Sequence, residues 1–428
     1  LDGADKSISN LVFVPAHYLK QFHPDHTSKA SLDAKVKEAG FDTWTQLFAV
    51  EALPHLSGNR PGMAAWVPDG TTVSDQVFTI KRNPYFVGID PQGNQLPYID
   101  EIRFTFYADR EALNLAAVAG EIDFQGRHIS MSTYPVLKEN ENKANYRVVT
   151  WPTFGGSDAV VMLNQTWTGP EGEYFRNKDF RIALSHAIDR EAIKELAFYG
   201  LGESRQGVPA PFHPYYPGDE YAFRYTELDM DKANSLLDGI LPNKDSDGFR
   251  LMSNGNILDI EIGIVPQFGN WPDIGQLIVE NWAEVGVKAH IEIRERTQHF
   301  NMRPANELMS EIWNEDTTGF PFSGQPKFDP RSDPALTFAP LIAKWYASGG
   351  KEGQAPPAEI KRLVDIIDEA KTSGRNRQIA LAKELFRIWA DNVWEIGTVG
   401  MTPMIQGVLV ANDKLQNVPA VAGNDWPL

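Results

Sequence analysis

The stretch that decides the fold is Arg82-Asn-Pro-Tyr-Phe-Val-Gly-Ile-Asp-Pro-Gln-Gly-Asn-Gln-Leu-Pro-Tyr-Ile-Asp100. Its prolines restrict the backbone, and Asp90-Pro-Gln-Gly93 places Pro and Gly at the second and fourth positions of a turn. Tyr85, Phe86 and Tyr98 carry a large apolar area that is unfavourable in water. The stretch is therefore predicted to be an ordered surface segment rather than a flexible linker.

A strand, a helix and a second strand are predicted to follow this segment. Ile102-Arg-Phe-Thr-Phe106 alternates with the period of a strand. Residues 110–119 have helical spacing, and Gly120 is a typical helix stop. Ile122-Asp-Phe124 again reads as a strand.

This order of residues resembles the bacterial extracellular solute-binding proteins of family 5, the oligopeptide-binding type. The segment from Arg82 to Asp100 and Gly120-Glu-Ile-Asp-Phe124 carry the likeness. Phe180-Arg-Ile-Ala-Leu-Ser-His-Ala-Ile-Asp-Arg190 is similar to the family's signature at the start of its second lobe. Ala233-Asn-Ser-Leu-Leu237, followed by Asp245-Ser-Asp-Gly-Phe-Arg250, is similar to another family segment. The resemblance runs from about residue 10 to about residue 420.

The resemblance implies a two-lobed α/β periplasmic-binding-protein fold of type II, cluster C-like. It implies a receptor of an ABC importer that binds a small organic ligand by hinge closure and works with a membrane permease. The first expected ligand is an oligopeptide and the alternative is an oligosaccharide. The protein is expected to be a monomer without cofactor or enzymatic activity. Its expected location is periplasmic or extracellular, and attachment to the membrane by a lipid anchor is compatible with the resemblance. A hydrolase on a similar scaffold is the contrasting class.

The start of the chain departs from the family. Leu1-Asp-Gly-Ala-Asp-Lys6 has neither the basic start nor the apolar core of a signal peptide. Family members carry a substantial segment before the point that Leu11-Val-Phe-Val-Pro-Ala-His17 resembles. Lobe I is therefore expected to be incomplete at its N-terminus, with an exposed sheet edge or apolar patch. Truncation, proteolysis and a separate second chain all remain open.

Composition agrees with two lobes and excludes several classes of function. The 428 residues exceed the usual size of a single core. The absence of cysteine removes disulfides, thiol catalysis and cysteine metal sites. A formal charge of −17 argues against nucleic acid and anionic membrane surfaces as partners. No apolar run of 18 residues offers a membrane span.

Three regions are predicted: lobe I over residues 1–156, lobe II over 157–395 and a return to lobe I over 396–428. Val148-Val-Thr-Trp-Pro-Thr-Phe-Gly-Gly156 reads as a strand that breaks into Pro and paired Gly, which indicates a crossing between lobes. Residues 258–265, 272–285 and 287–293 predict a parallel, right-handed βαβ unit. Residues 359–370 and 376–392 predict two more helices.

The loop Gln267-Phe-Gly-Asn-Trp-Pro272 follows a predicted strand directly. In open α/β sheets, ligands bind at the carboxyl ends of strands and near the start of the next helix. Gln267, Phe268 and Trp271 are therefore candidate ligand-binding residues. Trp151 and Phe154 at the first crossing and Trp394 at the return are further candidates. The alternative is that these aromatic residues fill the core, as expected for Trp282, Trp345 and Trp389.

Trp313-Asn-Glu-Asp316 resembles the family's tryptophan-x-x-aspartate segment, whose carboxylate pairs with the free amino terminus of a peptide ligand. Thr317-Thr-Gly-Phe-Pro321 departs from the sequence that usually follows in peptide binders. Either Asp316 has this role, or the ligand lacks an ammonium group, as sugars do. A surface acidic loop is the remaining alternative.

Metal and catalytic signatures are weak. Asn243-Lys-Asp-Ser-Asp-Gly248 resembles a calcium loop, with Asn243, Asp245 and Asp247 as weak candidate ligands. Its twelfth position is Asn254 rather than Glu, so a solvated turn at Gly248 is the preferred interpretation. His186 lies in an Ala/Ile-rich helix and is interpreted as structural. The 57 acidic residues make accidental carboxylate pairs plentiful, so such pairs are weak evidence for an enzyme.

Overall fold

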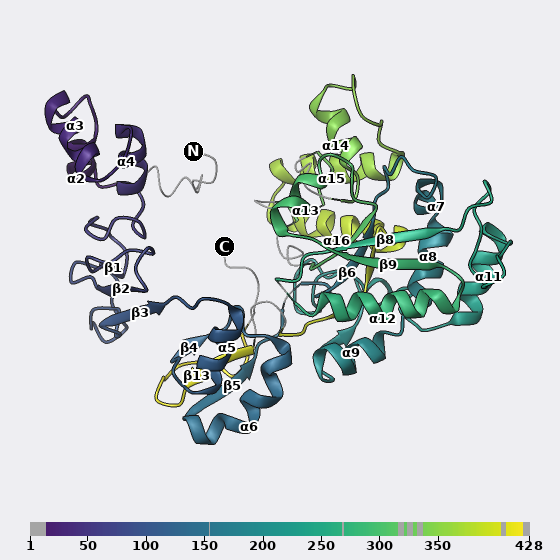
Figure 1. The fold of residues 1–428 in the computed structure, drawn as a ribbon, viewed down its shortest axis with the longest axis horizontal. Helices are drawn as coiled ribbons and strands as arrows, with labels where there is room; N and C mark the ends of the chain where they lie inside the picture. The colour runs from purple at the N-terminus through teal and green to yellow at the C-terminus, as the bar shows by residue number, and fades with distance from the viewer. Residues whose placement is uncertain are drawn as a thin grey trace. The chain divides into compact units, whose positions relative to one another are not determined.

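The structure is a computed structural model that describes residues 14–153, 155–267, 269–315, 321–322, 328–331, 337–403 and 408–422. The chain divides into two compact units, Leu1–Asp109 and Arg110–Leu428. Figure 1 labels the helices and strands of both units. In the described part of the chain, no helix has both the length and the apolar character needed to cross a membrane.

The first unit begins with short helices around a small apolar cluster. They are α2 (Ala16–Leu19), η1 (Lys20–Phe22), α3 (Lys29–Glu38) and α4 (Trp44–Glu51). Ser28 caps α3, and Thr43 with Gln46 forms a capping box on α4. Leu19, Phe22, Val36 and Leu47 form the buried centre of this cluster.

A three-stranded antiparallel sheet completes the first unit. Its strands are β1 (Trp66–Pro68), β2 (Val77–Arg82) and β3 (Glu101–Thr105), in the order β1-β2-β3. The segment that opened the sequence analysis connects β2 to β3. Polar contacts hold this connecting segment in one conformation. The Asp90 carboxylate accepts hydrogen bonds from the backbone N–H of Gln92 and Asn94 and from the Tyr98 hydroxyl.

The aromatic argument for this segment is wrong for two of its three side chains. Tyr85 is 87% exposed and Tyr98 is 65% exposed. The hydroxyl of Tyr98, rather than its ring, holds the segment, because it donates to Asp90 at 2.7 Å. This bond, followed by the bond from Asn94, lowers the pKa of Asp90 to about 2.

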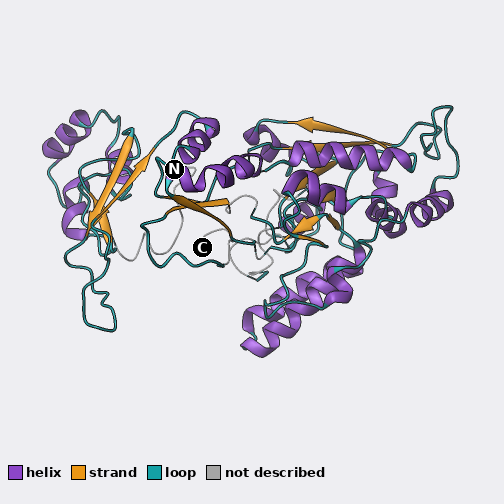
Figure 2. Cartoon of the chain, turned by 90° about the horizontal axis from the view of Figure 1, so that it is seen from below, coloured by secondary structure: helices purple, strands orange, loops and turns teal. Residues whose placement is uncertain are grey.

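The second unit contains both helices and strands (Figure 2). Its smaller antiparallel sheet has the order β4-β13-β5, formed by β4 (Phe124–Gln125), β13 (Val408–Asn412) and β5 (Tyr146–Thr150). It lies with α5 (Arg110–Val118), η2 (Met131–Thr133) and α6 (Tyr134–Ala144) around a core that includes Leu137 and Val410. The chain therefore returns at residues 408–412 to a sheet that residues 124–150 begin.

The larger sheet has five strands in the order β11-β6-β10-β8-β9. They are β6 (Val160–Leu163), β8 (Asp259–Ile264), β9 (Lys288–Ile293), β10 (Ser310–Trp313) and β11 (Glu395–Gly397). The pairs β8–β9 and β8–β10 are parallel, whereas β6 is antiparallel to both β10 and β11. Helix α12 (Trp271–Glu284) connects β8 to β9, which confirms the predicted parallel βαβ unit.

Helices cover both faces of this sheet. Val161 and Leu163 belong to one core and Met162 to the other, as expected for successive residues of a strand. The first core includes residues of α7 (Gly172–Arg176), α8 (Lys178–His186), α9 (Arg190–Phe198), α11 (Met230–Ile240) and α12. The second includes residues of α10 (Asp219–Ala222), α14 (Pro340–Ala347), α15 (Ala358–Thr372) and α16 (Arg375–Asn392). The short strands β7 (Glu203–Ser204) and β12 (Val399–Gly400) pair separately, and α13 (Arg296–Met302) lies between β9 and β10 in the chain.

The predicted lobe boundaries, 1–156, 157–395 and 396–428, stay a prediction. The compact units divide at residues 109 and 110. Within the second unit, the chain leaves the smaller sheet after Thr150 and enters the larger one at Val160. It leaves the larger sheet after Gly397 and re-enters the smaller one at Val408.

Candidate functional site

The candidate site lies at one edge of the five-stranded sheet. Strands β8 and β10 are parallel and end at this edge, where the antiparallel strand β6 begins and β11 also ends. Residues 155–159, 265–267, 269–271, 314–315 and 398–403 therefore lie at this edge. Carboxyl ends of parallel strands are the usual ligand-binding position in such sheets.

Two segments link the smaller sheet to this edge. We call residues 151–159 the first crossing segment and residues 398–403 the second crossing segment. The buried Asp158 carboxylate joins them: its Oδ1 accepts from the Thr153 hydroxyl at 2.8 Å, and its Oδ2 accepts from the Thr402 backbone N–H at 2.9 Å. The Asp158 N–H donates to the Val399 carbonyl at 2.8 Å. One buried carboxylate thus orders both crossing segments.

The backbone after β10 packs against the first crossing segment. The Gly156 N–H donates to the Glu315 carbonyl at 3.1 Å, and the Glu315 N–H donates to the Ser157 carbonyl at 2.8 Å. A Cβ at Gly156 would overlap the backbone of Gly207, and one at Gly400 would overlap the carbonyl of Gly156. These backbones approach so closely that the positions accept only glycine without a shift.

The structure brings Trp271 and Trp313 together. Their ring centroids are 5.1 Å apart. Trp271 is fully buried, and its Nε1 donates to the Asp158 carbonyl at 3.0 Å. Trp313, at the end of β10, is half-buried. Gln267 is exposed, and its carbonyl accepts from the Arg110 guanidinium at 3.1 Å.

Trp394 and Trp151 do not join this pair of rings. Trp394 precedes β11 at the opposite end of that strand, and it is buried against Phe338 and Trp389 in the core beside α16. Trp151 is half-buried and donates its Nε1 to the Pro419 carbonyl at 3.0 Å. Phe154, Phe268 and Asp316 lie outside the described residues. Ligand contacts of all eight candidates stay a prediction.

Sequence reasoning missed a charged cluster beside Trp313. Glu311 on β10 is fully buried, and its Oε2 accepts from His299 Nε2 at 2.7 Å and from Arg303 Nε at 3.0 Å and Nη2 at 2.7 Å. Burial alone would raise the pKa of Glu311, but the charge of Arg303 and the bond from His299 hold it below its usual range.

The sequence positions of these residues contained an indication of the cluster. Glu311 and Trp313 are two residues apart on a strand and share a face, whereas His299 and Arg303 are four apart at α13. The missing information was that α13 packs on β10, which only the tertiary structure supplies. The Arg303 guanidinium lies 4.5 Å from both the Trp313 ring and the Phe300 ring. The His299 ring stacks on Trp313 at an interplanar angle of 17°.

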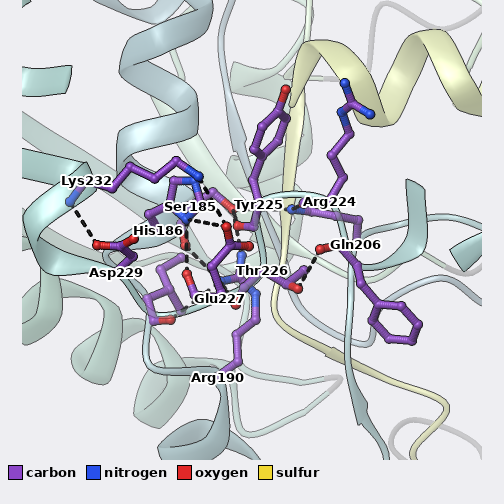
Figure 3. Close-up of polar contacts among 12 residues, drawn as sticks. Ser185, His186, Arg190, Gln206, Arg224, Tyr225, Thr226, Glu227, Asp229 and Lys232 are labelled. Atoms are coloured by element: carbon purple, nitrogen blue, oxygen red, sulfur yellow. Dashed lines mark hydrogen bonds and ion pairs between the residues drawn. The ribbon is translucent and has the colours of Figure 1, made fainter. Parts of the chain in front are cut away.

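A second polar network surrounds Arg190 and includes Ser185, Gln206 and Thr226 (Figure 3). Two of its members, Arg190 and Gln206, also bond Gly397, the last residue of β11. Arg190 closes the Phe180–Arg190 segment and is buried, which lowers its pKa to about 9. Its guanidinium donates to the carbonyls of Gly397 at 2.9 Å, Ser185 at 2.7 Å and Thr226 at 3.1 Å. The side-chain carbonyl of Gln206 accepts from the Gly397 N–H at 2.8 Å. The signature segment therefore fixes the strand from which the second crossing segment starts.

His186 and the 243–248 loop have structural explanations. His186 is buried, its Nδ1 is 3.1 Å from the Glu227 carbonyl, and burial lowers its pKa. Asp245 Oδ1 accepts from the N–H groups of Asp247 and Phe249, and Gly248 has a φ of +90°. Across the described residues, no three His, Cys, Asp or Glu side chains are placed to hold a metal ion. The geometry supports the polar turn that is the preferred interpretation, and calcium binding stays the weaker alternative.

Comparison with known proteins identifies the family. The sequence model described as "Bacterial extracellular solute-binding proteins, family 5 Middle" matches residues 61–386. The periplasmic alpha-galactoside-binding protein of Rhizobium meliloti (strain 1021) is 26% identical over 432 residues, covering 95% of this chain and 56% of that protein. The oligopeptide-binding protein AppA of Bacillus subtilis (strain 168) is 28% identical over 186 residues, covering 40% of this chain and 31% of that protein. The chain thus spans about half the length of the first relative and less of the second.

Solved structures agree in fold. The oligopeptide-binding protein OppA matches with a TM-score of 0.75 and 33% identity, over 96% of this chain and 67% of that one. The periplasmic binding protein MelB of Agrobacterium fabrum C58, in complex with stachyose, matches with a TM-score of 0.62 and 20% identity. The match covers 95% of this chain and 59% of that one. The fold class is therefore the mixed α/β fold of two-lobed periplasmic binding proteins, as predicted. The family match over residues 61–386 and the likeness to OppA show that this chain belongs to family 5 of the bacterial extracellular solute-binding proteins.

Proposed function

We propose that the chain is the ligand-binding part of an ABC importer receptor that captures an oligopeptide by closure of two lobes. The observation that supports this ligand is the 33% identity to a structure named oligopeptide-binding protein, across 96% of this chain. Ligand contacts from both lobes would favour the closed form over the open one. The closed form would then be recognised by the membrane permease.

The proposed contact surface is the sheet edge with its crossing segments. Trp313 is half-buried and is the ring that we propose contacts the ligand, whereas Trp271 is fully buried and packs against Trp313. Gln267 is exposed at the same edge. Asp316, three residues after Trp313, remains the proposed partner for a peptide's amino terminus.

An oligosaccharide is the second candidate ligand. The protein that is 26% identical over 95% of this chain is named an alpha-galactoside-binding protein. A partly exposed indole ring also suits a sugar, because the C–H groups of a sugar ring pack on an aromatic face. Trp313 could serve either ligand class, so the ring alone does not choose between them.

The remaining parts of the proposal concern partners and location. We infer a monomer without cofactor and without turnover, located in the periplasm or on the outer surface, where a lipid anchor is one means of attachment. The family consists of substrate-binding proteins, which supports a role in binding rather than catalysis. The acidic net charge of −17 disfavours nucleic acid as a partner.

Native mass spectrometry of the purified protein, followed by calorimetric titration, tests these proposals. We expect a monomer mass with a retained ligand, and binding of either a nonapeptide or stachyose but not both with equal affinity. Incubation with peptide and glycoside panels should leave both substrates intact. Absence of binding to both probes would contradict the proposed ligand classes, and turnover of either would favour the hydrolase alternative.

A further inference from the structure

The Trp313 ring is held by a charged cluster that has no evident purpose in stability. Glu311 and His299 are fully buried, and Arg303 is 5% exposed. Breaking a buried ion pair is costly, but forming one gains little over apolar packing. The cluster is not even fully satisfied: Glu311 Oε1 and His299 Nδ1 are buried without a hydrogen-bond partner among the described residues. Such groups in a native fold call for another explanation.

The geometry directs the cluster at Trp313. The Arg303 guanidinium is fixed by two hydrogen bonds to Glu311 Oε2, so its plane cannot turn freely. It lies 4.5 Å from the centre of the Trp313 ring and 4.5 Å from the centre of the Phe300 ring. A planar guanidinium stacks on aromatic faces, and a desolvated contact of this kind is strong.

The other neighbours of Trp313 restrict the same ring. His299, whose Nε2 donates to Glu311, stacks on Trp313 with a centroid distance of 6.4 Å. Phe300 meets the ring edge-on at 5.4 Å, and Trp271 meets it at 5.1 Å. Trp313 is nevertheless only half-buried at the end of β10.

We propose that Arg303, held by Glu311, is a positioning residue that sets the orientation of the Trp313 ring for stacking on the ligand. This inference rests on the proposed function, because it takes Trp313 as the ligand-contacting ring. Arg303 acts through Trp313 and makes no ligand contact of its own. A correctly fixed ring loses little conformational entropy on binding, which is how preorganisation improves affinity.

A second arginine–glutamate pair, comparable to Arg303–Glu311, involves the neighbouring strand β8. Arg294 donates to Glu261 Oε1 at 2.7 Å, and its side chain is also nearly buried. Glu261 lies on β8, whereas Glu311 lies on β10, the strand that carries Trp313. Arg294→Met therefore removes an arginine–glutamate pair from the same sheet and is the control for Arg303→Met.

The first measurement needs no ligand. Trp residues are replaced by 5-fluorotryptophan, and the ¹⁹F signal of Trp313 is assigned by its loss in Trp313→Phe. We expect Arg303→Met, Arg303→Lys and Glu311→Gln to shift or broaden this signal, and Arg294→Met to leave it in place. Arg303→Lys keeps a cation beside Glu311 but lacks the planar stack, so it remains informative if Arg303→Met unfolds. An unchanged Trp313 signal in Arg303→Lys, or an equal change in Arg294→Met, overturns the proposal.

The second measurement is a double-mutant cycle in ligand affinity, with stachyose and a nonapeptide as probes. For the probe that binds, Arg303→Met should weaken binding at least threefold in the unmodified background and have no further effect in Trp313→Phe. Additive effects would mean that Arg303 acts independently of Trp313 and would overturn the proposal. Failure of both probes to bind the unmodified protein would contradict the proposed ligand classes, and the ¹⁹F comparison would still decide whether Arg303 positions the ring.

Discussion

The indole nitrogen of Trp271 donates a hydrogen bond to the backbone carbonyl of Asp158 at 3.0 Å. This bond joins the first residue of α12 to the first crossing segment, although the two residues are far apart in the chain. The same Asp158 uses its side chain to bind Thr153 and Thr402. The helix that follows β8 and both crossing segments therefore meet at one residue.

Asp158 should contribute strongly to stability. Asp158→Ala leaves the buried N–H of Thr402 without its acceptor, and we expect a loss of about 2 kcal/mol in the free energy of unfolding. Asp158→Asn should recover part of this loss, because its amide oxygen can accept from Thr402 and its amide N–H can donate to the Thr153 hydroxyl. Urea unfolding measures the difference. Glu139→Ala, at an exposed position of α6, is the control and should stay within about 0.5 kcal/mol. Equal stability of Asp158→Ala and the control would contradict the role of Asp158.

Substitution of Arg190 should reduce the stability of the fold more than substitution of Asp158. Arg190→Met removes a guanidinium that donates to the carbonyls of Gly397, Ser185 and Thr226, and leaves these oxygens buried. We expect a loss of about 3 kcal/mol or more in the free energy of unfolding. Lys361→Met, at an exposed position of α15, is the control for removing a cation. A loss below about 1 kcal/mol for Arg190→Met would show that the network in Figure 3 is dispensable.

The Asp90–Tyr98 bond should give the first unit a defined dependence on pH. The pKa of Asp90 is lowered to about 2 in the folded state, so the unfolded state binds this proton more readily. Stability from Asp90 is therefore fully present above about pH 4 and is lost as the pH falls towards 2. Tyr98→Phe removes the first cause of the shift, so the pKa of Asp90 should rise towards its ordinary value.

An NMR titration of the Asp90 carboxyl carbon measures this effect. Tyr85→Phe is the matched control, because Tyr85 lies in the same segment and is 87% exposed. It should leave the Asp90 titration where it is. Coincident titrations in Tyr98→Phe and the unmodified protein would mean that the hydroxyl does not hold the carboxylate.

Asp316 should separate the two ligand classes. Asp316→Asn should weaken a peptide ligand by more than 1.4 kcal/mol, about tenfold, if the carboxylate meets an ammonium group. For a neutral oligosaccharide, the same substitution should matter less than Trp313→Ala, which removes the stacking surface. Calorimetric titration gives both values. Asp365→Asn, at an exposed carboxylate of α15 away from this edge, is the control. Unchanged affinity in both Asp316→Asn and Trp313→Ala would place the ligand elsewhere.

Local patterns predicted the regular elements of the second unit well. The helices predicted at residues 359–370 and 376–392 appear as α15 (Ala358–Thr372) and α16 (Arg375–Asn392). The predicted βαβ unit is confirmed because alternation and helical spacing are local properties of the sequence. The opening segment is also ordered, but through the polar contacts of Asp90, including the Tyr98 hydroxyl, rather than through burial of its tyrosine rings.

Side-chain direction was harder to predict than position. Trp271 lies at the strand end where the sequence placed it, but its ring is turned inwards because its nitrogen finds the Asp158 carbonyl. Trp394 lies at the amino end of β11, and its ring fills the core beside Trp389. Periodicity does not tell which way a strand runs, so it could not separate Trp394 from Trp313. The Glu311–Arg303 contact depends on how α13 packs on β10 and has no local signal strong enough to single it out.

The backbone junction at Gly156 and Gly400 limits which substitutions this protein can accept. At both positions an added Cβ would strike the main chain of another segment rather than the movable end of a side chain. Relatives that differ in ligand therefore have little freedom to alter this junction by substitution. Changes in specificity should accumulate instead in the side chains around it, such as Trp313 and its neighbours. A change of ligand is in this way compatible with an unchanged backbone contact between Gly156 and Gly400.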